Sequence, residues 1–343
     1  MKIAVHYEKN LQEDSYSHKW INFLEKNKVD VCLINFKQSN IIEKIKDCDG
    51  IMWHWFHSAE DKQCAPKILQ AIEEALNIPI FPNIKTRWHF DEKVAQHYFL
   101  DAINAPKIKS WVFWNYNEAK IFLEKSKYPL VYKLSVGAGS SHVIKLDTKK
   151  QAIKLLKKNF IKGVFPYTEK TILFKQKYWR FKISHRLLDS IMFILLNDYP
   201  KLPKYFIPQK NYIYLQEFIP DNNYDIRITT IGNRAFCFTR YNRKNDFRAS
   251  GSGMINYDQK KIPLEAIKIA HKISKENGFQ SMAYDFLINK KNQILINEIS
   301  YCYVNKAIHK CPGYWDRNLK WYSGNIWPEK AQVDDFIKSI SNK

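Results

Sequence analysis

The sequence predicts an α/β fold that changes to an α+β organisation toward the C-terminus. In residues 1–85, short apolar runs alternate with amphipathic helical segments, which is typical of a parallel α/β unit. After residue 212, apolar runs follow one another as antiparallel strands, with one helix between them at about 263–277. A chain of 343 residues is long enough for two or three subdomains with cores of their own.

The N-terminal α/β domain is expected to span 1–85. Its apolar runs predict strands at 2–6, 30–35, 50–55 and 77–82, and its helical spacing predicts helices at about 15–27 and 61–76. The run Trp53–His57 overlaps the end of the third of these strands. It is suited either to buried packing, the favoured reading, or to lining a pocket.

Residues 86–212 are expected to form a linker helix and a central subdomain. The pattern predicts helices at 90–100, about 117–126 and 149–158, and strands at 110–113, 129–134 and 143–146. Asp91 is placed near the cap of the first helix. The aromatic and basic segment at about 160–212 reads as an insertion, and 213–343 as the C-terminal subdomain.

Composition limits the class of protein. The formal net charge of +21 attracts polyanions and anionic small molecules. No apolar run reaches the roughly 18 residues of a membrane span, and the first residues read as a strand rather than a signal peptide. The six cysteines have no CxxC spacing and read as reduced thiols, although Cys302 and Cys311 also allow a reactive thiol. A cytoplasmic protein is expected.

A hairpin in the last third of the chain brings two acids together. If its turn centres on Lys291–Asn292, Asp285 lies directly opposite Glu298, and Ser300 lies two residues further along the same face. Opposed like charges are destabilising, so the pair needs a cation, for which Mg²⁺ is well suited. The alternative is another register with two solvent-facing acids.

Lys133 and the glycine loop that follows it are typical of an anion site. Gly137, Gly139, Ser140 and Ser141 can bring backbone N–H groups close to phosphate oxygens, and Lys133 adds a cation. A plain hairpin turn is the alternative, because the loop is neither a Walker A motif nor a dinucleotide fingerprint.

Two further segments carry polar groups on apolar strands. Gln216 and Glu217 can offer backbone groups to an adenine edge and an acid to ribose, or can belong to a solvated edge strand. Arg227 and Arg240 lie in or at the end of apolar strands, where an unpaired guanidinium is costly, so each needs a phosphate or carboxylate. Arg248 beside a Ser/Gly-rich loop fits an anion clamp; surface salt bridges are the alternative.

These segments occur in an order that resembles the ATP-grasp superfamily, and within it ligases similar to glutathione synthetase and the ribosomal-protein glutamate ligases. The resemblance covers residues 80–303. The matching segments are Asp91–Lys93, Leu130–Lys133, the loop 137–141, Leu215–Ile219, Asp225–Arg227, Arg240 with Asp246–Arg248, Asp285, and Asn297–Ser300.

The resemblance implies an ATP-grasp fold of three parts: an N-terminal α/β domain, a central lid subdomain and a C-terminal antiparallel subdomain, with ATP between two sheets. It implies that Lys93 and Lys133 contact phosphate and that Gln216, Glu217 and Ile219 contact adenine. Asp285 and Glu298 would bind Mg²⁺. The position of Ser300 is usually Asn in this family, so one metal ion is expected and a second is doubtful.

The implied reaction phosphorylates a carboxylate, and an amine then attacks the acyl phosphate. Arg240 and Arg248 are expected to act on the phosphoryl group. The expected partners are ATP and an anionic small-molecule or glycan-type carboxylate, and a homodimer is compatible with the sequence. An ATP-grasp kinase or degenerate ATP-binding protein is the first alternative. A polyanion- or nucleic-acid-binding protein, motivated by the charge and by residues 178–186, is the least favoured.

Overall fold

The computed structural model describes residues 1–7, 15–137, 142–164, 208–244 and 246–342. These residues group into two compact units. The larger comprises residues 1–57, 61–108 and 219–343, and the smaller comprises 109–218 together with 58–60. Most of the predicted insertion, including residues 178–186, lies outside the described residues.

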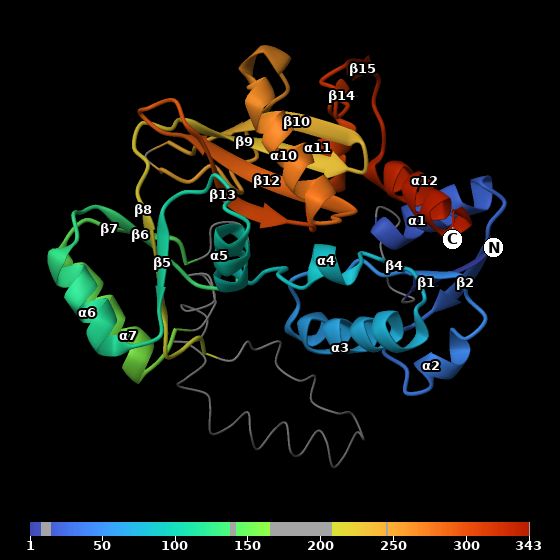
Figure 1. The fold of residues 1–343 in the computed structure, drawn as a ribbon, viewed down its shortest axis with the longest axis horizontal. Helices are drawn as coiled ribbons and strands as arrows, with labels where there is room; N and C mark the ends of the chain where they lie inside the picture. Colours follow the sequence, from blue (N-terminus) through green and yellow to red (C-terminus); the bar gives the residue numbers. More distant parts are fainter. Residues whose placement is uncertain (8–14, 138–141, 165–207, 245, 343) are drawn as a thin grey trace, which may run out of the picture. The chain divides into compact units, whose positions relative to one another are not determined.

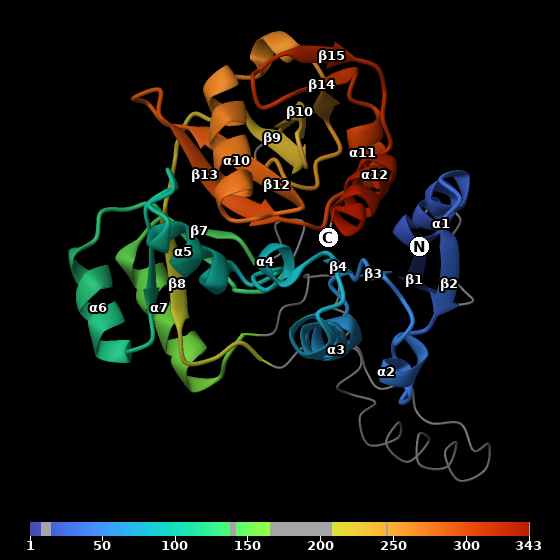
Figure 2. The same ribbon diagram turned by 45° about the vertical axis from the view of Figure 1, so that its right-hand side comes forward.

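The first sheet of the larger unit is parallel, as the alternating pattern predicts. Its strands are β1 (Lys2–His6), β2 (Asp30–Ile34), β3 (Gly50–Met52) and β4 (Ile80–Phe81), in the order β2-β1-β3-β4. The connecting helices are α1 (Tyr16–Lys26), α2 (Ile41–Lys44) and α3 (Ala59–Leu76), and α4 (Ile84–Arg87) follows β4. Figure 2 shows α3 as the long helix near this sheet.

The second sheet of the larger unit carries the acidic hairpin. It contains β9 (Tyr224–Ile231), β10 (Arg234–Tyr241), β12 (Ser281–Ile288), β13 (Ile294–Ser300), β14 (Gly313–Trp315) and β15 (Trp321–Ser323), and the short β11 (Ile255–Asn256) pairs with β10. The strand order is β13-β12-β9-β10-β14-β15 (Figure 1). β9 and β12 are therefore central strands, so their side chains are largely shielded from water.

One helix packs on the second sheet and is hydrogen-bonded to two of its strands. On one face lies α10 (Leu264–Glu276), which follows the 3-10 turn η1 (Gln259–Lys261). Its Ser274 hydroxyl lies 2.7 Å from both the Tyr284 hydroxyl on β12 and the Thr230 hydroxyl on β9. These bonds join one helix to two strands, which limits sliding between β9 and β12.

The last helices tie the end of the chain to its beginning. After α11 (Asn305–His309), α12 (Pro328–Ser341) packs against α1 (Figure 1). The buried Trp20 indole donates a hydrogen bond of 2.8 Å to Gln332 Oε1. Two apolar clusters each contain residues of both sheets of the larger unit.

Helix α5 (Lys93–Ala102) begins later than the sequence pattern predicts. Asp91 adopts a φ of +51°, in the left-handed region, so the chain cannot be helical there, and Glu92 is the N-cap residue. The segment after α5 joins the hairpin, because Ile108 N–H donates to Ile296 O at 3.0 Å and Ile296 N–H donates to Pro106 O at 2.7 Å. Residues 86–108 therefore group with the larger unit.

In its described residues, the smaller unit is an antiparallel sheet with two helices. Its strands β5 (Ser110–Phe113), β6 (Leu130–Lys133), β7 (Ile144–Leu146) and β8 (Ile213–Glu217) have the order β5-β8-β6-β7. Helices α6 (Tyr116–Lys125) and α7 (Lys149–Ile161) close its core. Thr148 begins α7 with a capping box to Gln151. No helix among the described residues of either unit is long and apolar enough to cross a membrane.

Candidate functional site

The hairpin of β12 and β13 places Asp285 directly opposite Glu298, as predicted. Ser300 pairs with the next residue on the same face, Ala283. The register arises differently from the prediction, since the turn is centred on Lys291 rather than between Lys291 and Asn292. A β-bulge between Asp285 and Phe286 then inserts Asn297 as an extra residue and shifts the pairing by one. The bulge is what brings the two acids face to face.

Asp285 is bound by two arginines, one on the adjacent strand β9 and one on the next strand, β10. Arg227 on β9 lies opposite it and makes two hydrogen bonds to its carboxylate, one of them at 2.8 Å from Nη2 to Oδ2. Arg240 on β10 places Nη2 2.8 Å from the same Oδ2. Arg240 also binds Asp225 on β9, with its Nε 2.8 Å from Oδ1. We call these four residues the charge ladder.

The ladder explains why charged groups can lie on central strands. The side chains of Asp225 and Asp285 are only 6% and 7% exposed, and that of Arg240 is 11% exposed. Burial alone would raise the pKa of the Asp285 carboxyl, but Arg227 and Arg240 outweigh it and hold that pKa well below its usual range. Asp285 is therefore charged throughout the physiological range of pH, while burial raises the pKa of Asp225.

Glu298 has a more open environment than Asp285. Its side chain is 31% exposed, and Lys93 at the start of α5 places Nζ 3.4 Å from Oε1. One turn later in α5, Gln96 accepts a hydrogen bond from Ile299 N–H through Oε1 at 3.3 Å. This bond holds the beginning of α5 against β13 and so positions Lys93 beside the acidic pair.

The chain itself supplies cations to the acidic pair and to Asp225. Arg227, Arg240 and Lys93 provide three positive charges for Asp225, Asp285 and Glu298. Among the described residues, no group of three or more His, Cys, Asp or Glu side chains is suited to holding a metal ion.

The Ser300 hydroxyl is engaged by local backbone. It donates to Cys302 O at 3.0 Å and accepts from Cys302 N–H at 3.1 Å. A serine hydroxyl has one proton and two lone pairs, so a single lone pair is left for any other partner. Ser300 shares a face with Asp285 and Glu298 but is tied to the turn after β13.

Arg248 lies in the loop after β10 and pairs with an acid of its own. Its Nε is 2.9 Å from Asp246 Oδ1 and its Nη2 is 2.9 Å from Asp246 Oδ2. Hydrogen bonding from Arg248 lowers the pKa of Asp246. The Arg248 side chain is 34% exposed, so this guanidinium is more open to solvent than the two in the ladder.

The smaller unit carries the residues expected to contact a nucleotide. Lys133 ends β6 and is buried, and Gly137 has a φ of +118°, which explains the need for glycine there. Gly139, Ser140 and Ser141 lie outside the described residues. The first part of the loop is held by Ser135, whose N–H donates to the Tyr212 hydroxyl at 2.8 Å.

The segment 216–219 leaves the smaller unit at the end of β8. β8 lies between β5 and β6, so the edge-strand alternative is wrong. Gln216 is buried and donates from Nε2 to the Ser110 hydroxyl at 3.2 Å, while Glu217 is exposed. Ile219 is the first residue of the larger unit after the crossing.

Sequence reasoning missed one feature of this region, and one of its alternatives is not supported. Asp225 was not assigned a role, although its spacing of two residues from Arg227 places both on one face of a strand. The alternative of a reactive thiol is not supported, because burial raises the pKa of both Cys302 and Cys311 to about 12.

Comparison with known proteins identifies the fold. No protein-family model matches the sequence, and no curated protein matches it significantly. A RimK domain ATP-grasp protein from Sphaerobacter thermophilus aligns with a TM-score of 0.57 at 13% identity, covering 98% of this chain and 100% of that chain. D-alanine–D-alanine ligase from Bacillus anthracis, complexed with ATP, aligns with a TM-score of 0.54 at 14% identity, covering 100% and 97%.

A RiPP-associated ATP-grasp ligase from Chryseobacterium gregarium, in complex with ADP and a leader and core peptide, aligns with a TM-score of 0.57 at 13% identity and covers 98% of this chain and 97% of that chain. These alignments extend over both units and confirm the fold expected from the order of the motifs. The chain has the ATP-grasp fold.

Proposed function

We propose that this protein is an ATP-dependent carboxylate–amine ligase that releases ADP. The observation that carries the proposal is the opposed pair Asp285 and Glu298, with Lys93 beside it, on the second sheet of an ATP-grasp fold. The similar solved structures are described as ligases, including one complexed with ATP and one with ADP and a peptide. No protein nucleophile is needed for this chemistry.

The proposed reaction has two steps. A carboxylate oxygen attacks the γ-phosphorus of ATP, the bond to the β-phosphate oxygen breaks, and an acyl phosphate and ADP form. An amine then attacks the acyl carbon, the bond to the phosphate oxygen breaks, and the amide, inorganic phosphate and a proton are released. Charge accumulates on phosphoryl oxygens in the first step, so fixed cations lower the barrier most there.

Several polar residues are proposed to contact the nucleotide. Lys93 and Lys133 would contact phosphate oxygens, and the loop with Gly137, Gly139, Ser140 and Ser141 would offer backbone N–H groups. These assignments rest on the order of the motifs. Gln216, Glu217 and Ile219 would contact the adenine and ribose.

The donors on the hairpin fit one Mg²⁺ ion better than two. Asp285 already accepts three N–H bonds of the roughly four that a carboxylate can accept, and Ser300 has one lone pair left. Glu298 is the most available ligand. A bound Mg²⁺ would neutralise charge on the phosphate oxygens, and waters with those oxygens would complete its shell.

The two catalytic arginines are proposed to act differently. Arg240 binds Asp225 and Asp285 in the ladder, so it would act by holding Asp285 charged and in place. Arg227 would do the same from β9. Arg248 is more open to solvent than the two arginines of the ladder, and it is proposed to contact phosphoryl oxygens directly.

Release of ADP tests the proposal. Purified protein with Mg-ATP and a panel of carboxylates and amines is expected to release ADP and to yield an amide detectable by mass spectrometry. Glu298→Gln should abolish ADP release while preserving the far-UV circular dichroism spectrum. Equal ADP release by wild type and Glu298→Gln would overturn the assignment.

A kinase or an ATP-binding protein without ligase activity is the second candidate. The bonds between Ser300 and the backbone of Cys302 favour it, because they leave few ligands for a second metal ion. In this case ATP would bind, or the substrate would be phosphorylated, without formation of a joined product. A stable amide identified by mass spectrometry would exclude this candidate.

A further inference from the structure

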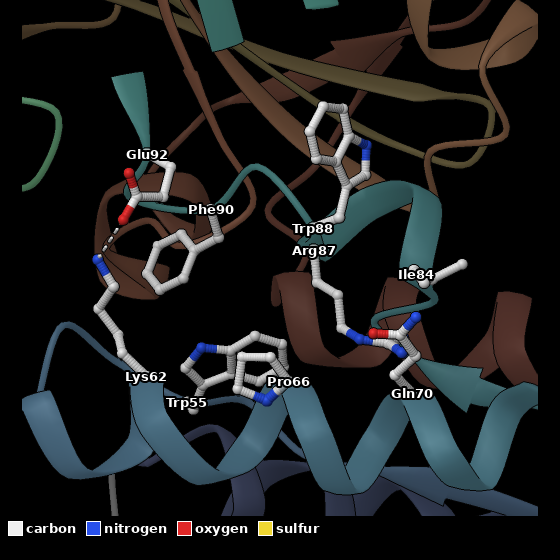
Figure 3. A pocket seen from close by; sticks show the side chains of 9 residues that line it. All are labelled: Trp55, Lys62, Pro66, Gln70, Ile84, Arg87, Trp88, Phe90 and Glu92. Carbon is white, nitrogen blue, oxygen red and sulfur yellow. Dashed lines mark hydrogen bonds and ion pairs between the residues drawn. The ribbon is translucent and has the colours of Figure 1, made fainter. Parts of the chain in front are cut away.

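A cavity in the larger unit lies next to, but outside, the charge ladder. It has a volume of about 220 Å³, and the side chains of Trp55, Phe90 and Trp88 contribute to its walls (Figure 3). A cavity of about 150 Å³ holds benzene, so this one is suited to a ligand of roughly ten non-hydrogen atoms. The Trp53–His57 run therefore combines packing with cavity lining: Trp55 lines this cavity, and Trp53, His54 and Phe56 line a second one.

One face of α3 forms the floor of the cavity. Lys62, Pro66 and Gln70 follow one another at four-residue spacing and point into the same space (Figure 3). The first and last of them are about 12 Å apart along the helix axis. The cavity is therefore elongated, with a charged end at Lys62, a polar end at Gln70 and an apolar middle.

The charged end has hydrogen-bond donors to offer. The Trp55 indole N–H has no partner among the described residues, although Trp55 is only 2% exposed, and its nitrogen is turned toward the side of the cavity where Lys62 and Phe90 lie (Figure 3). Lys62 binds Asp91 Oδ2 at 3.0 Å but is 3.5 Å from Glu92 Oε1. Glu92 is 42% exposed, so this longer contact is easily replaced.

The opposite end has a second donor without a partner. Arg87 is buried, and its Nη1 binds Glu73 and Pro82 O, the latter at 2.9 Å. Its Nη2 has no hydrogen-bond partner among the described residues. Both ends therefore favour a ligand that accepts hydrogen bonds.

The charged end is adjacent to the acidic pair. Glu92 immediately precedes Lys93, which pairs with Glu298. Tyr301 follows Ser300 and packs on two walls of the cavity, with ring centroids 5.2 Å from Trp55 and 4.5 Å from Phe90. A group bound at Lys62 would thus take the place of Glu92, the residue that immediately precedes the lysine proposed to contact phosphate.

We propose that this cavity binds the carboxylate substrate, and that this substrate is a small acid with a monocyclic aromatic or branched aliphatic body. Its carboxylate replaces Glu92 at Lys62 and accepts a hydrogen bond from the Trp55 N–H, while its body lies between Pro66 and the indole of Trp88. The role of the ligand rests on the proposed ligase function, but its binding does not. Pro66 and Phe90 offer no side-chain hydrogen-bond partners to the hydroxyl groups of a glycan-type acid, so such an acid is expected to bind less well.

Binding without nucleotide tests the proposal. The full-length protein is titrated with 3-phenylpropanoate, with 3-phenylpropan-1-ol and with glucuronate, and binding is followed by isothermal titration calorimetry and saturation-transfer NMR. The expected order of affinity is 3-phenylpropanoate above the alcohol, with glucuronate weakest. Trp88→Ala should weaken 3-phenylpropanoate at least about fivefold, because it removes a large apolar contact.

Trp114→Ala is the matched control. Trp114 is 57% exposed, similar to the 50% of Trp88, but it lies in the smaller unit. It should leave affinity unchanged. Glu92→Gln should tighten 3-phenylpropanoate because it removes a competing carboxylate, and Lys62→Met should abolish the preference for the acid over the alcohol.

Two results would overturn the proposal. One is the absence of saturable 3-phenylpropanoate binding to the wild-type protein, and the other is equal weakening by Trp88→Ala and Trp114→Ala. Loss of the ligase hypothesis would look different: 3-phenylpropanoate would bind as described, but it would neither stimulate ADP release nor become amidated.

Discussion

The two acids of the hairpin face each other, yet their surroundings differ. Asp285 is 7% exposed and its carboxylate binds two arginines, one on β9 and one on β10. Glu298 is 31% exposed and has one lysine at 3.4 Å. The difference follows from position, since β12 is a central strand and β13 is at the end of its sheet. Asp285 is therefore expected to contribute mainly to stability, whereas the Glu298 carboxylate is accessible to a ligand.

The largest effect is expected from Asp285→Asn. It leaves Arg227 and Arg240 buried with one carboxylate between them, and breaking a buried ion pair in this way costs about 3–5 kcal/mol of folding free energy. Urea unfolding followed by circular dichroism measures it. Adding Arg227→Met should recover part of the loss, because the two side chains interact. A change in the free energy of unfolding within about 0.5 kcal/mol would mean that the ladder does not contribute to stability.

Glu298→Gln should have a small effect on stability and a large effect on activity. Because the pair with Lys93 is partly exposed, the free energy of unfolding should change by less than about 1 kcal/mol. The rate of ADP release should fall at least about 100-fold, since even groups that support a metal ligand contribute 10–100-fold. Parallel unfolding and activity assays separate the two quantities. A large loss of stability with retained activity would reverse the proposed roles.

Acid should affect the stability contributed by buried histidines differently from that contributed by Asp285. Burial lowers the pKa of His54 to about 3 and that of His89 to about 4. Below the ordinary histidine pKa of about 6.5, the unfolded chain takes up protons that the folded chain does not. The free energy of unfolding should therefore decrease as pH falls from 6.5 toward 4, by up to about 1.4 kcal/mol per pH unit for each histidine.

Asp285 should contribute nothing to this slope. The pKa of Asp285 is depressed in the folded state, so its contribution is complete above the unfolded pKa of about 3.9 and decreases only at lower pH. Urea unfolding at a series of pH values should give a smaller slope in His54→Phe and an unchanged slope in Asp285→Asn. The reverse pattern would assign the acid sensitivity to the ladder.

The smallest effect on ADP release is expected from Ser300→Ala. It removes both hydrogen bonds between the hydroxyl and the backbone of Cys302, each worth about 1 kcal/mol, and should change ADP release less than about threefold. Steady-state kinetics at varied Mg²⁺ measures this. A 10–100-fold loss that is relieved by high Mg²⁺ would make Ser300 a metal ligand.

Much of the fold could be predicted from periodicity, because the strands of the parallel sheet and of the hairpin are apolar runs with clear ends. The opposition of Asp285 and Glu298 was also predictable, but its cause was not. The bulge at Asn297 has no residue that marks it in the sequence. The pairing of Arg240 with Asp225 depends on the register between β9 and β10, which spacing alone does not give.

The cavity could not be predicted for a related reason. Its walls come from the segment after β3, the exposed face of α3 and the segment after α4, and only the folded chain brings Trp55, Lys62 and Trp88 together. The sequence singled out Trp53–His57 as a group, but which side chain faces inward to the core and which lines a cavity is set by packing.

The central claim is that Glu298 is the accessible ligand of a Mg-ATP site, and nucleotide binding tests it without knowledge of the substrate. Isothermal titration calorimetry of the wild-type protein with a non-hydrolysable ATP analogue should show binding that weakens at least about tenfold when EDTA replaces Mg²⁺. In Glu298→Gln, the affinity should no longer depend on Mg²⁺. Identical Mg²⁺ dependence in the wild type and in Glu298→Gln would contradict the account.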